Sequence, residues 1–306
     1  MTVIVFGGTG FIGRNVCAAL AARGRDVLAV SRTRPAVPVP GAAFAPLDLV
    51  RAARDELAGL IRSAGAEAVV NAAGASWQAR TEELMTEAHV SLVANLQAAL
   101  ACLGKPPHFV QIGTVHEYGE GRRGSAIDEN TPAAATTLYG RSKLAGTKLL
   151  LDAAGDGRLD CLVMRVSNVV GAGAPATSLP GRVADLLREA AVTGGPAVLE
   201  FGSLDAYRDF VDARDVADAV ATAVTTRTCG LLNIGSGRAV RARDLVECLV
   251  RLSGVPARIE VAEAAGTGPA GWQLMDVTRA RRLLGWAPRR SLEEALQALW
   301  AGRRAA

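Results

Sequence analysis

The sequence lacks any apolar stretch long enough to cross a membrane. Its uncharged segments are interrupted by Gly, Ser or Pro and stay below the roughly 20 apolar residues that a spanning helix needs. No basic segment followed by a long apolar run stands at the start, where Met1 leads directly into an apolar segment at residues 3–6. These absences predict a soluble, cytoplasmic chain. With 306 residues, 50% of them hydrophobic, the chain is also expected to fold around a sizeable core.

Paired cysteines and clustered basic residues are also missing. The five cysteines are Cys17, Cys102, Cys161, Cys229 and Cys248. They are far apart, with no C-x-x-C pair and no histidine at ligand spacing, so we expect buried thiols and no metal site. The net charge is +4, but arginines are interspersed with acidic residues, which predicts no nucleic-acid partner. The excess charge suits an anionic small substrate or cofactor.

The order of the expected elements is typical of an α/β protein. Apolar strand-like segments alternate with helix-like segments in the first half of the chain. The strands are expected at residues 3–6, 27–31, 68–72, 108–112 and 160–166, and the helices at 13–22, 51–63, 82–103 and 139–153. This alternation predicts a doubly wound parallel sheet of the Rossmann type.

The pattern changes after residue 170, at a segment rich in Gly and Pro. Helices are expected at 181–193, 242–253 and 292–303, and a strand at 231–234. We therefore predict an NADP-binding Rossmann domain over 1–170, which also takes in about 209–234, and a smaller substrate-binding region over 171–306. One cleft is expected between them.

Three glycines follow the first expected strand at a spacing of three residues. Gly7 permits a tight turn, Gly10 lets the backbone approach a pyrophosphate, and Gly13 lets the helix pack closely on the sheet. The N–H groups at the start of the next helix would point at the phosphates, and Phe11 and Ile12, within the turn, are expected at the cofactor. The segment predicts a dinucleotide site.

The end of the second expected strand carries no carboxylate. An NAD site usually offers an acidic side chain there to the ribose 2′-hydroxyl. Here Ser31 and Arg32 stand at this place, where Arg32 can pair with a 2′-phosphate and Ser31 can donate a hydrogen bond. The alternative is that Arg32 and Arg34 are ordinary loop charges. The missing acid favours NADP(H) as the cofactor.

Tyr139 and Lys143 are one helical turn apart, which puts both side chains on one face. An adjacent ammonium lowers the pKa of a phenol from about 10 and makes it a better proton donor or acceptor near neutral pH. Thr114 follows the strand at 108–112, at the edge where open α/β sheets bind ligands. These three residues are the expected catalytic group, although Tyr139 and Lys143 alone could simply belong to an amphipathic helix.

Together with further segments in the same order, these motifs resemble the extended short-chain dehydrogenase/reductase family, also described as the NAD-dependent epimerase/dehydratase family. The further segments are 48–49, 71–74, 118–119, 165–169, 208–210, 233–237 and 283–286. The resemblance implies that Asp48 and Leu49 meet the adenine, that Ala72 and Ala73 line the pyrophosphate, and that Lys143 holds the nicotinamide ribose.

The resemblance also implies the reaction. Thr114 would bind the substrate oxygen, Tyr139 would transfer its proton, and the cofactor would exchange a hydride with the carbon. Dehydratases of the family carry Asp-Glu directly after the threonine, where this chain has Val115 and His116, and Glu117 is expected to point elsewhere. We therefore expect NADPH-dependent reduction of a keto group, most like a 4-ketoreductase of a dTDP-type deoxysugar. The alternatives are a nucleotide-sugar epimerase, a reductase of a non-nucleotide ketone, and a non-catalytic NADP-binding regulator.

Three residues are expected at the substrate. Asn168 and Arg208 match family positions that bind the substrate's diphosphate, although Arg208 could instead pair with Asp209 or Asp212. His116 could exchange a proton next to the ketone or only shape the pocket.

Two places depart from the family pattern. His89 stands where the family usually has Asn, and residues 262–271 lack an arginine that the family often has there. The helices at 82–103 and 139–153 are those that relatives pair, which implies a homodimer.

Overall fold

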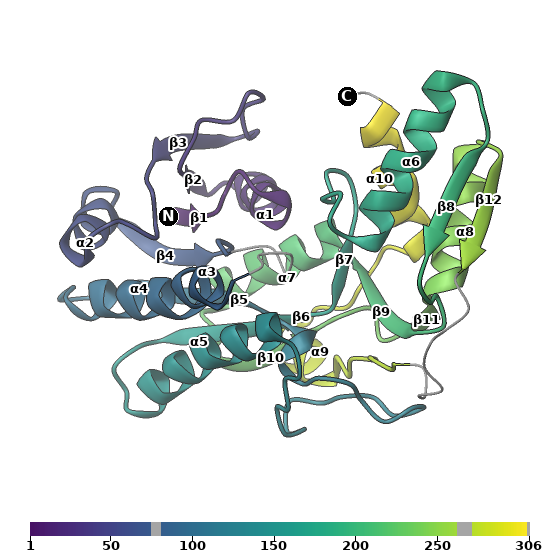
Figure 1. Cartoon of the computed structure of the whole chain (residues 1–306). Helices are drawn as coiled ribbons and strands as arrows, with labels where there is room; N and C mark the ends of the chain where they lie inside the picture. Colours follow the sequence, from purple (N-terminus) through teal and green to yellow (C-terminus); the bar gives the residue numbers. More distant parts are fainter. Residues whose placement is uncertain (75–80, 262–270, 305–306) are drawn as a thin grey trace.

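A seven-stranded parallel sheet forms the centre of the larger part of the molecule (Figure 1). The computed structural model describes residues 1–74, 81–261 and 271–304. The strand order is β10-β6-β5-β4-β1-β2-β3, and the order reverses between β1 and β4, where open α/β sheets bind ligands. The strands are β1 (Thr2–Phe6), β2 (Asp26–Ser31), β3 (Ala42–Pro46), β4 (Ala66–Asn71), β5 (His108–Thr114), β6 (Cys161–Val166) and β10 (Gly230–Ile234). The predicted doubly wound sheet is confirmed.

Helices cover both faces of this sheet. One face carries α1 (Phe11–Ala21) and α7 (Ala213–Thr226), which pack against each other. The other face carries α2 (Arg54–Ser63), α4 (Leu92–Ala101) and α5 (Leu138–Gly155). β5 and β6 are buried along their whole length, which explains why most of their residues are apolar and do not alternate with exposed polar ones.

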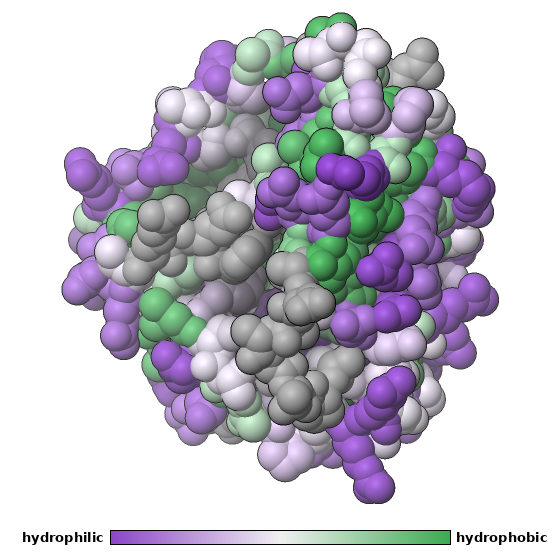
Figure 2. All heavy atoms as spheres, turned by 45° about the vertical axis from the view of Figure 1, so that its right-hand side comes forward, coloured by the Kyte–Doolittle hydropathy of each residue, from purple (hydrophilic) through white to green (hydrophobic). Residues whose placement is uncertain are grey.

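The smaller part of the molecule has a core of its own. α6 (Leu179–Thr193), α8 (Ala242–Ser253) and α10 (Leu292–Arg304) pack around the parallel pair of β8 (Ala197–Phe201) and β12 (Ala257–Val261). Figure 2 turns this side forward and shows a band of hydrophobic side chains bordered by hydrophilic ones.

The strands of a three-stranded sheet join the two parts. They are β7 (Asn168–Val170), β9 (Tyr207–Asp212) and β11 (Ala239–Arg241). β7 and β9 contact both α7 of the larger part and α10 of the smaller part. The remaining elements are α3 (Glu82–Thr86), η1 (Glu87–Ser91), η2 (Val115–Glu117) and α9 (Thr278–Leu284). Within the described residues, no helix is both long enough and apolar enough to cross a membrane. The domain limits given above and the homodimer stay predictions.

The helix expected at 82–103 is present as one continuous helical run over 82–101, in which a π-helical turn, η1, lies between α3 and α4. α5 approaches the backbone of this turn very closely. A Cβ added to Gly146 would lie 2.3 Å from the carbonyl oxygen of His89. The π turn therefore lies where two helices make backbone contact.

The expectation that the five cysteines are buried thiols is wrong for some of them. Cys17 and Cys161 are buried, Cys248 is half-buried, and Cys102 and Cys229 are exposed. Cys102 is exposed because it caps the end of α4, and Cys229 because it precedes the edge strand β10.

Candidate active site

In the turn between β1 and α1, backbone segments lie unusually close to one another. Gly7 has φ +73°, and a Cβ there would lie 2.7 Å from the backbone nitrogen of Ala73. A Cβ on Gly13 would lie 2.0 Å from the carbonyl oxygen of Gly7. Gly8, which sequence reasoning missed, is equally confined, since its Cβ would lie 2.8 Å from that of Ala29. Larger residues do not fit this turn.

The start of α1 is open to an anion. Gly10 is the N-cap and therefore offers no capping side chain, and its own N–H bonds to the Gly7 carbonyl at 2.9 Å. Phe11 and Ile12 are the first two residues of the helix, and their N–H groups have no acceptor within the helix. The positive end of the helix dipole adds to this, so the turn fits a pyrophosphate.

The end of β2 is tied to the same turn. Thr9 Oγ1 donates a hydrogen bond to Ser31 Oγ at 2.9 Å. The guanidinium of Arg34 lies over the ring of Phe44, 4.9 Å from its centroid. Arg32 is exposed and, within the described part of the chain, forms no ion pair. Arg32 is therefore the cation that a 2′-phosphate could engage at this edge.

Asp48 and Leu49 follow β3, and Ala72 and Ala73 follow β4, so both pairs lie at the carboxyl edge of the sheet. Asp48 accepts a hydrogen bond from the backbone of Val50 at 3.2 Å, and Leu49 is buried. This edge is where the sequence analysis expects the cofactor to lie.

Thr114 ends β5 and begins a short helical turn, η2, that is held by a buried carboxylate. Glu117 Oε1 accepts a hydrogen bond from the Thr114 N–H at 3.0 Å, and Glu117 Oε2 pairs with Arg165 Nε at 2.8 Å. The side chains of Glu117 and Arg165 are 0% and 5% exposed, so each charge depends on the other. Glu117 therefore points into the core, as expected, and fixes the backbone at Thr114.

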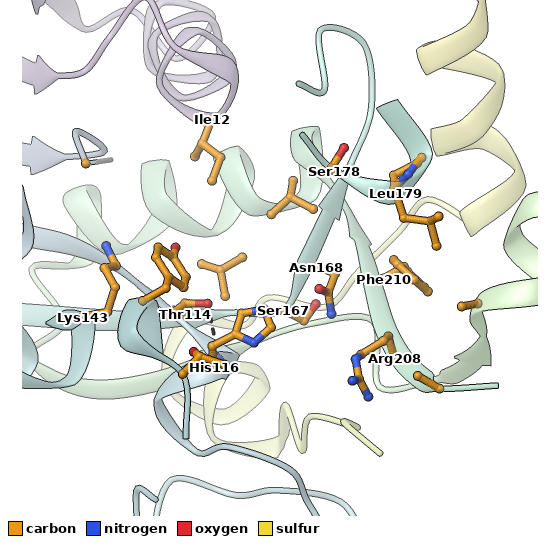
Figure 3. A pocket seen from close by; sticks show the side chains of 18 of the residues that line it. Ile12, Thr114, His116, Lys143, Ser167, Asn168, Ser178, Leu179, Arg208 and Phe210 are labelled. Carbon is orange, nitrogen blue, oxygen red and sulfur yellow. Dashed lines mark hydrogen bonds between the residues drawn. The ribbon is translucent and has the colours of Figure 1, made fainter. Parts of the chain in front are cut away.

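Tyr139 and Lys143 come from the first turns of α5, whose N-cap is Thr137. Thr114 lies close enough to Tyr139 for its hydroxyl to lower the pKa of the phenol. Lys143 Nζ donates a hydrogen bond to the Ile112 carbonyl at 2.7 Å. Figure 3 shows Thr114 and Lys143 on the same wall of the cavity. The three residues predicted to be catalytic therefore converge.

Burial dominates the acid–base properties of this wall. It raises the pKa of Tyr139 to about 12, and the hydroxyl of Thr114 offsets only part of that rise. It also lowers the pKa of Lys143, against the attraction of the Glu117 carboxylate. Loss of solvent disfavours both charged forms and outweighs other effects on the phenol, so the expected lowering of its pKa by Lys143 stays a prediction. At neutral pH Tyr139 carries its proton.

A cavity of about 1100 Å³ opens in front of these residues, between the large sheet and the smaller part of the molecule. The predicted site residues that line it are Ile12, Ala72, Ala73, Thr114, His116, Tyr139, Lys143, Asn168 and Arg208. The predicted contacts outside it are Gly7, Gly10, Phe11, Ser31, Arg32, Asp48 and Leu49. Ligand pockets typically measure about 300–1,000 Å³, so the cavity has room for part of a dinucleotide and a second molecule.

His116 faces the cavity (Figure 3). Burial, and then the positive charge of Arg208, lower its pKa to about 4. Its ring meets the ring of Tyr139 edge-on, with the centroids 5.9 Å apart. His116 thus shapes the space around the phenol.

Arg208 forms a bidentate ion pair with Glu120, with N–O distances of 2.8 and 3.2 Å. The alternative partners from the sequence analysis are wrong. Asp209 is buried and accepts hydrogen bonds from backbone N–H groups, and Asp212 pairs with Arg214. Successive strand residues face opposite sides, so Arg208 reaches the cavity while Asp209 does not. The family often has an arginine in the segment 262–271, where this chain has none. Of these positions, all but Gly271 lie outside the described residues.

Sequence reasoning missed most of the opposite wall. These residues are Ser178, Leu179, Arg182, Phe201, Leu204 and Phe210. Ser178 caps α6 by accepting a hydrogen bond from Gly181 N at 3.2 Å. A serine two residues before a proline is a helix-start signal that could have located this end of α6. Asn168, which was predicted, donates its Nδ2 to the carbonyl of Asp209 at 3.0 Å.

A family model independently matches most of the chain. The model of the NAD dependent epimerase/dehydratase family matches residues 3–235, which include the glycine turn, Thr114, Tyr139 and Lys143. The chain belongs to this family. The resemblance inferred from the motifs is thereby confirmed.

This member of the epimerase/dehydratase family is similar over nearly its whole length to proteins that act on nucleotide sugars. It is 45% identical to the dTDP-6-deoxy-L-talose 4-dehydrogenase (NAD(P)(+)) of Kitasatospora kifunensis over 301 residues, which are 97% of this chain and 94% of that protein. It is 25% identical to the UDP-glucose 4-epimerase of Neisseria gonorrhoeae, covering 98% of this chain and 96% of that protein. The structure of Thermus thermophilus UDP-glucose 4-epimerase in complex with NAD matches with a TM-score of 0.86, 25% identity and complete coverage (100%) of both chains.

Proposed function

We propose that this enzyme reduces a keto group at C4 of a dTDP-linked 6-deoxyhexose, with NADPH as the hydride donor. The observation that carries the proposal is that Thr114, Tyr139 and Lys143 line one cavity, with Lys143 one turn beyond Tyr139 along α5. The relative from Kitasatospora kifunensis, 45% identical, is named for chemistry at the same carbon of such a sugar. Its name gives the oxidative direction, but a dehydrogenase catalyses both oxidation and reduction.

The chain's own groups supply the proton. Thr114 binds the keto oxygen, and Tyr139 donates its phenolic proton to that oxygen. Burial keeps the phenol protonated, which is the form that reduction requires. Lys143, held by the carbonyl of Ile112, stabilises the phenolate that remains after the transfer. The bound cofactor supplies the hydride.

The cofactor proposal depends on the end of β2. Ser31 ends this strand and Arg32 follows it, without a carboxylate that would repel a 2′-phosphate. Arg32 would pair with that phosphate, since Arg34 is engaged by Phe44. NADP(H) is therefore the proposed cofactor, held by the glycine turn and the start of α1.

The substrate would lie across the cavity. Its sugar would be placed between Thr114 and Asn168, and its diphosphate would meet Arg208. The wall formed by Leu179 and Phe210 is apolar, which suits a 6-deoxy sugar and a thymine better than more hydroxylated groups.

The test is the stoichiometry of the reaction. We expect the purified enzyme to consume one NADPH for each dTDP-4-keto-6-deoxyhexose and to form a dTDP-6-deoxyhexose. Conversion of one nucleotide sugar into its C4 epimer without net NADPH consumption would instead identify an epimerase and overturn the proposal. Turnover of a simple ketone, with none of the dTDP-sugar, would overturn the substrate class.

A further inference from the structure

His89 contacts the catalytic helix at an unusual place in the fold. It lies in the π-helical turn η1, is 2% exposed, and lines the cavity. π-helical turns inside helices are frequently found at functional sites. The close approach of Gly146 to the carbonyl of His89 presses this turn against α5, so His89 has little freedom to move.

One ring nitrogen of His89 is tied to α5 by a hydrogen bond of defined direction. His89 Nδ1 lies 2.9 Å from Ser142 Oγ, and Ser142 Oγ donates its proton to the Tyr139 carbonyl at 2.9 Å. A serine hydroxyl has only one proton to donate. His89 Nδ1 is therefore the donor to Ser142. This chain of two hydrogen bonds ends on the backbone of Tyr139.

The ring of His89 also contacts the ring of Tyr139. The two rings meet edge to face, with centroids 5.4 Å apart and an angle of 81° between their planes. The imidazole of His116 makes a second such contact at 5.9 Å. Two imidazoles thus hold the aromatic ring of Tyr139.

We propose that His89 is a positioning residue that holds Tyr139 in line with Thr114, through Ser142 and through the contact between the rings. The proposal rests on the proposed function, in which Tyr139 is the proton donor. His89 acts on the phenol and not on the reacting atoms. Misplacing a catalytic group by about 1 Å can cost on the order of a hundredfold in rate.

The experiment compares three variants in steady-state reduction. His89→Ala should lower kcat by about ten- to a hundredfold and leave the KM for the keto sugar within about twofold, because positioning acts on the transition state. His89→Asn, whose amide nitrogen can replace Nδ1 as the donor to Ser142, should recover most of the lost kcat. His108→Asn is the matched control, since His108 is also buried but bonds to Thr228 at the other end of β5. It should leave kcat unchanged.

Three results would overturn the proposal. They are a kcat of folded His89→Ala within about twofold of wild type, an equal loss in His108→Asn, or no recovery in His89→Asn. Should His89→Ala not fold, Ser142→Ala takes its place, with the same expected loss of kcat at unchanged KM. An unchanged kcat in that variant would likewise overturn the proposal.

A second measurement does not depend on the substrate. The chain has three tyrosines, so isotope-labelled tyrosine gives an NMR spectrum in which Tyr139 is assigned from Tyr139→Phe. The ring-flip rate of Tyr139 should rise in His89→Ala and stay the same in His108→Asn. An unchanged rate in His89→Ala overturns the inference on His89. A wild-type enzyme that does not reduce the keto sugar overturns only the proposed function.

Discussion

The two walls of the cavity are built in different ways. Thr114 ends a fully buried strand, and its backbone is fixed by the buried pair of Glu117 and Arg165. Arg208, on the opposite wall, is held by an ion pair to Glu120, whose side chain is 48% exposed. Buried paired charges tolerate little movement, whereas an exposed ion pair contributes little to the free energy of folding and can rearrange. Under the proposed function, the fixed wall carries the chemistry and the adaptable wall the recognition of the substrate.

The largest effect is expected from Tyr139→Phe, because it removes the proton donor of the fixed wall. Turnover should fall by about 10²- to 10⁴-fold, while the Kd for NADPH stays close to wild type. Steady-state kinetics and calorimetric titration measure the two quantities. Tyr207→Phe is the matched control, since Tyr207 stacks on Trp272 at 5.3 Å and does not line the cavity. Near-normal turnover of Tyr139→Phe would refute its role as the acid.

Glu117→Ala should show how strongly the fixed wall depends on its buried pair. Removing one partner of a buried ion pair costs about 3–5 kcal/mol, because the other charge is left uncompensated. Glu293→Ala, which breaks an exposed ion pair with Arg251, should cost less than about 1 kcal/mol. Urea unfolding measures both free energies. Equal losses would contradict the contrast between buried and exposed pairs.

Arg32→Ala tests the proposed cofactor site at the end of β2. Losing a charged hydrogen bond to a 2′-phosphate costs about 1.5–3 kcal/mol, so the Kd for NADPH should rise by on the order of tenfold or more. The Kd for NADH should not change. Arg34→Ala is the control, because it removes a guanidinium that lies over Phe44 in the wild-type protein. A loss of affinity for both cofactors alike would show that Arg32 does not distinguish them.

The smallest effect is a pH dependence set by His116. Its folded-state pKa, lowered from 6.5 to about 4, is below that of the unfolded chain, so the unfolded chain takes up the proton first as the pH falls. Stability should therefore be lost as the pH falls below about 6.5, and this part of the loss should be absent in His116→Gln. Chemical unfolding at several pH values measures it. An identical pH dependence in both proteins would contradict a buried neutral imidazole.

Local sequence was sufficient for the dinucleotide turn and the catalytic group. Gly7 and Gly13 are needed because other backbone lies where a side chain would be, and this constraint acts within one βα turn. Tyr139 and Lys143 are close because they are one turn apart on a helix, which the spacing alone requires. The parallel sheet likewise follows from the alternation of mainly apolar strand segments with helical segments.

The opposite wall was not predictable in the same way. Arg182, Phe201 and Phe210 come from three separate elements, and no local pattern says that α6, β8 and β9 face one cavity. The partner of Arg208 is 88 positions away in the chain, so proximity along the sequence pointed to the wrong acids. The same limit explains why the π-helical turn at His89 was missed, because it lies where α5, a separate helix, makes close backbone contact.

The sequence by itself determined the α/β fold, the glycine turn, the missing acid after β2, and which residues are proposed as catalytic. Each of these depends on residues close together in the chain, where backbone geometry sets the outcome. Only the tertiary structure decided that burial keeps Tyr139 protonated, that Arg208 pairs with Glu120, and that His89 contacts the phenol ring. Burial and long-range pairing depend on how separate elements pack, which local spacing does not encode.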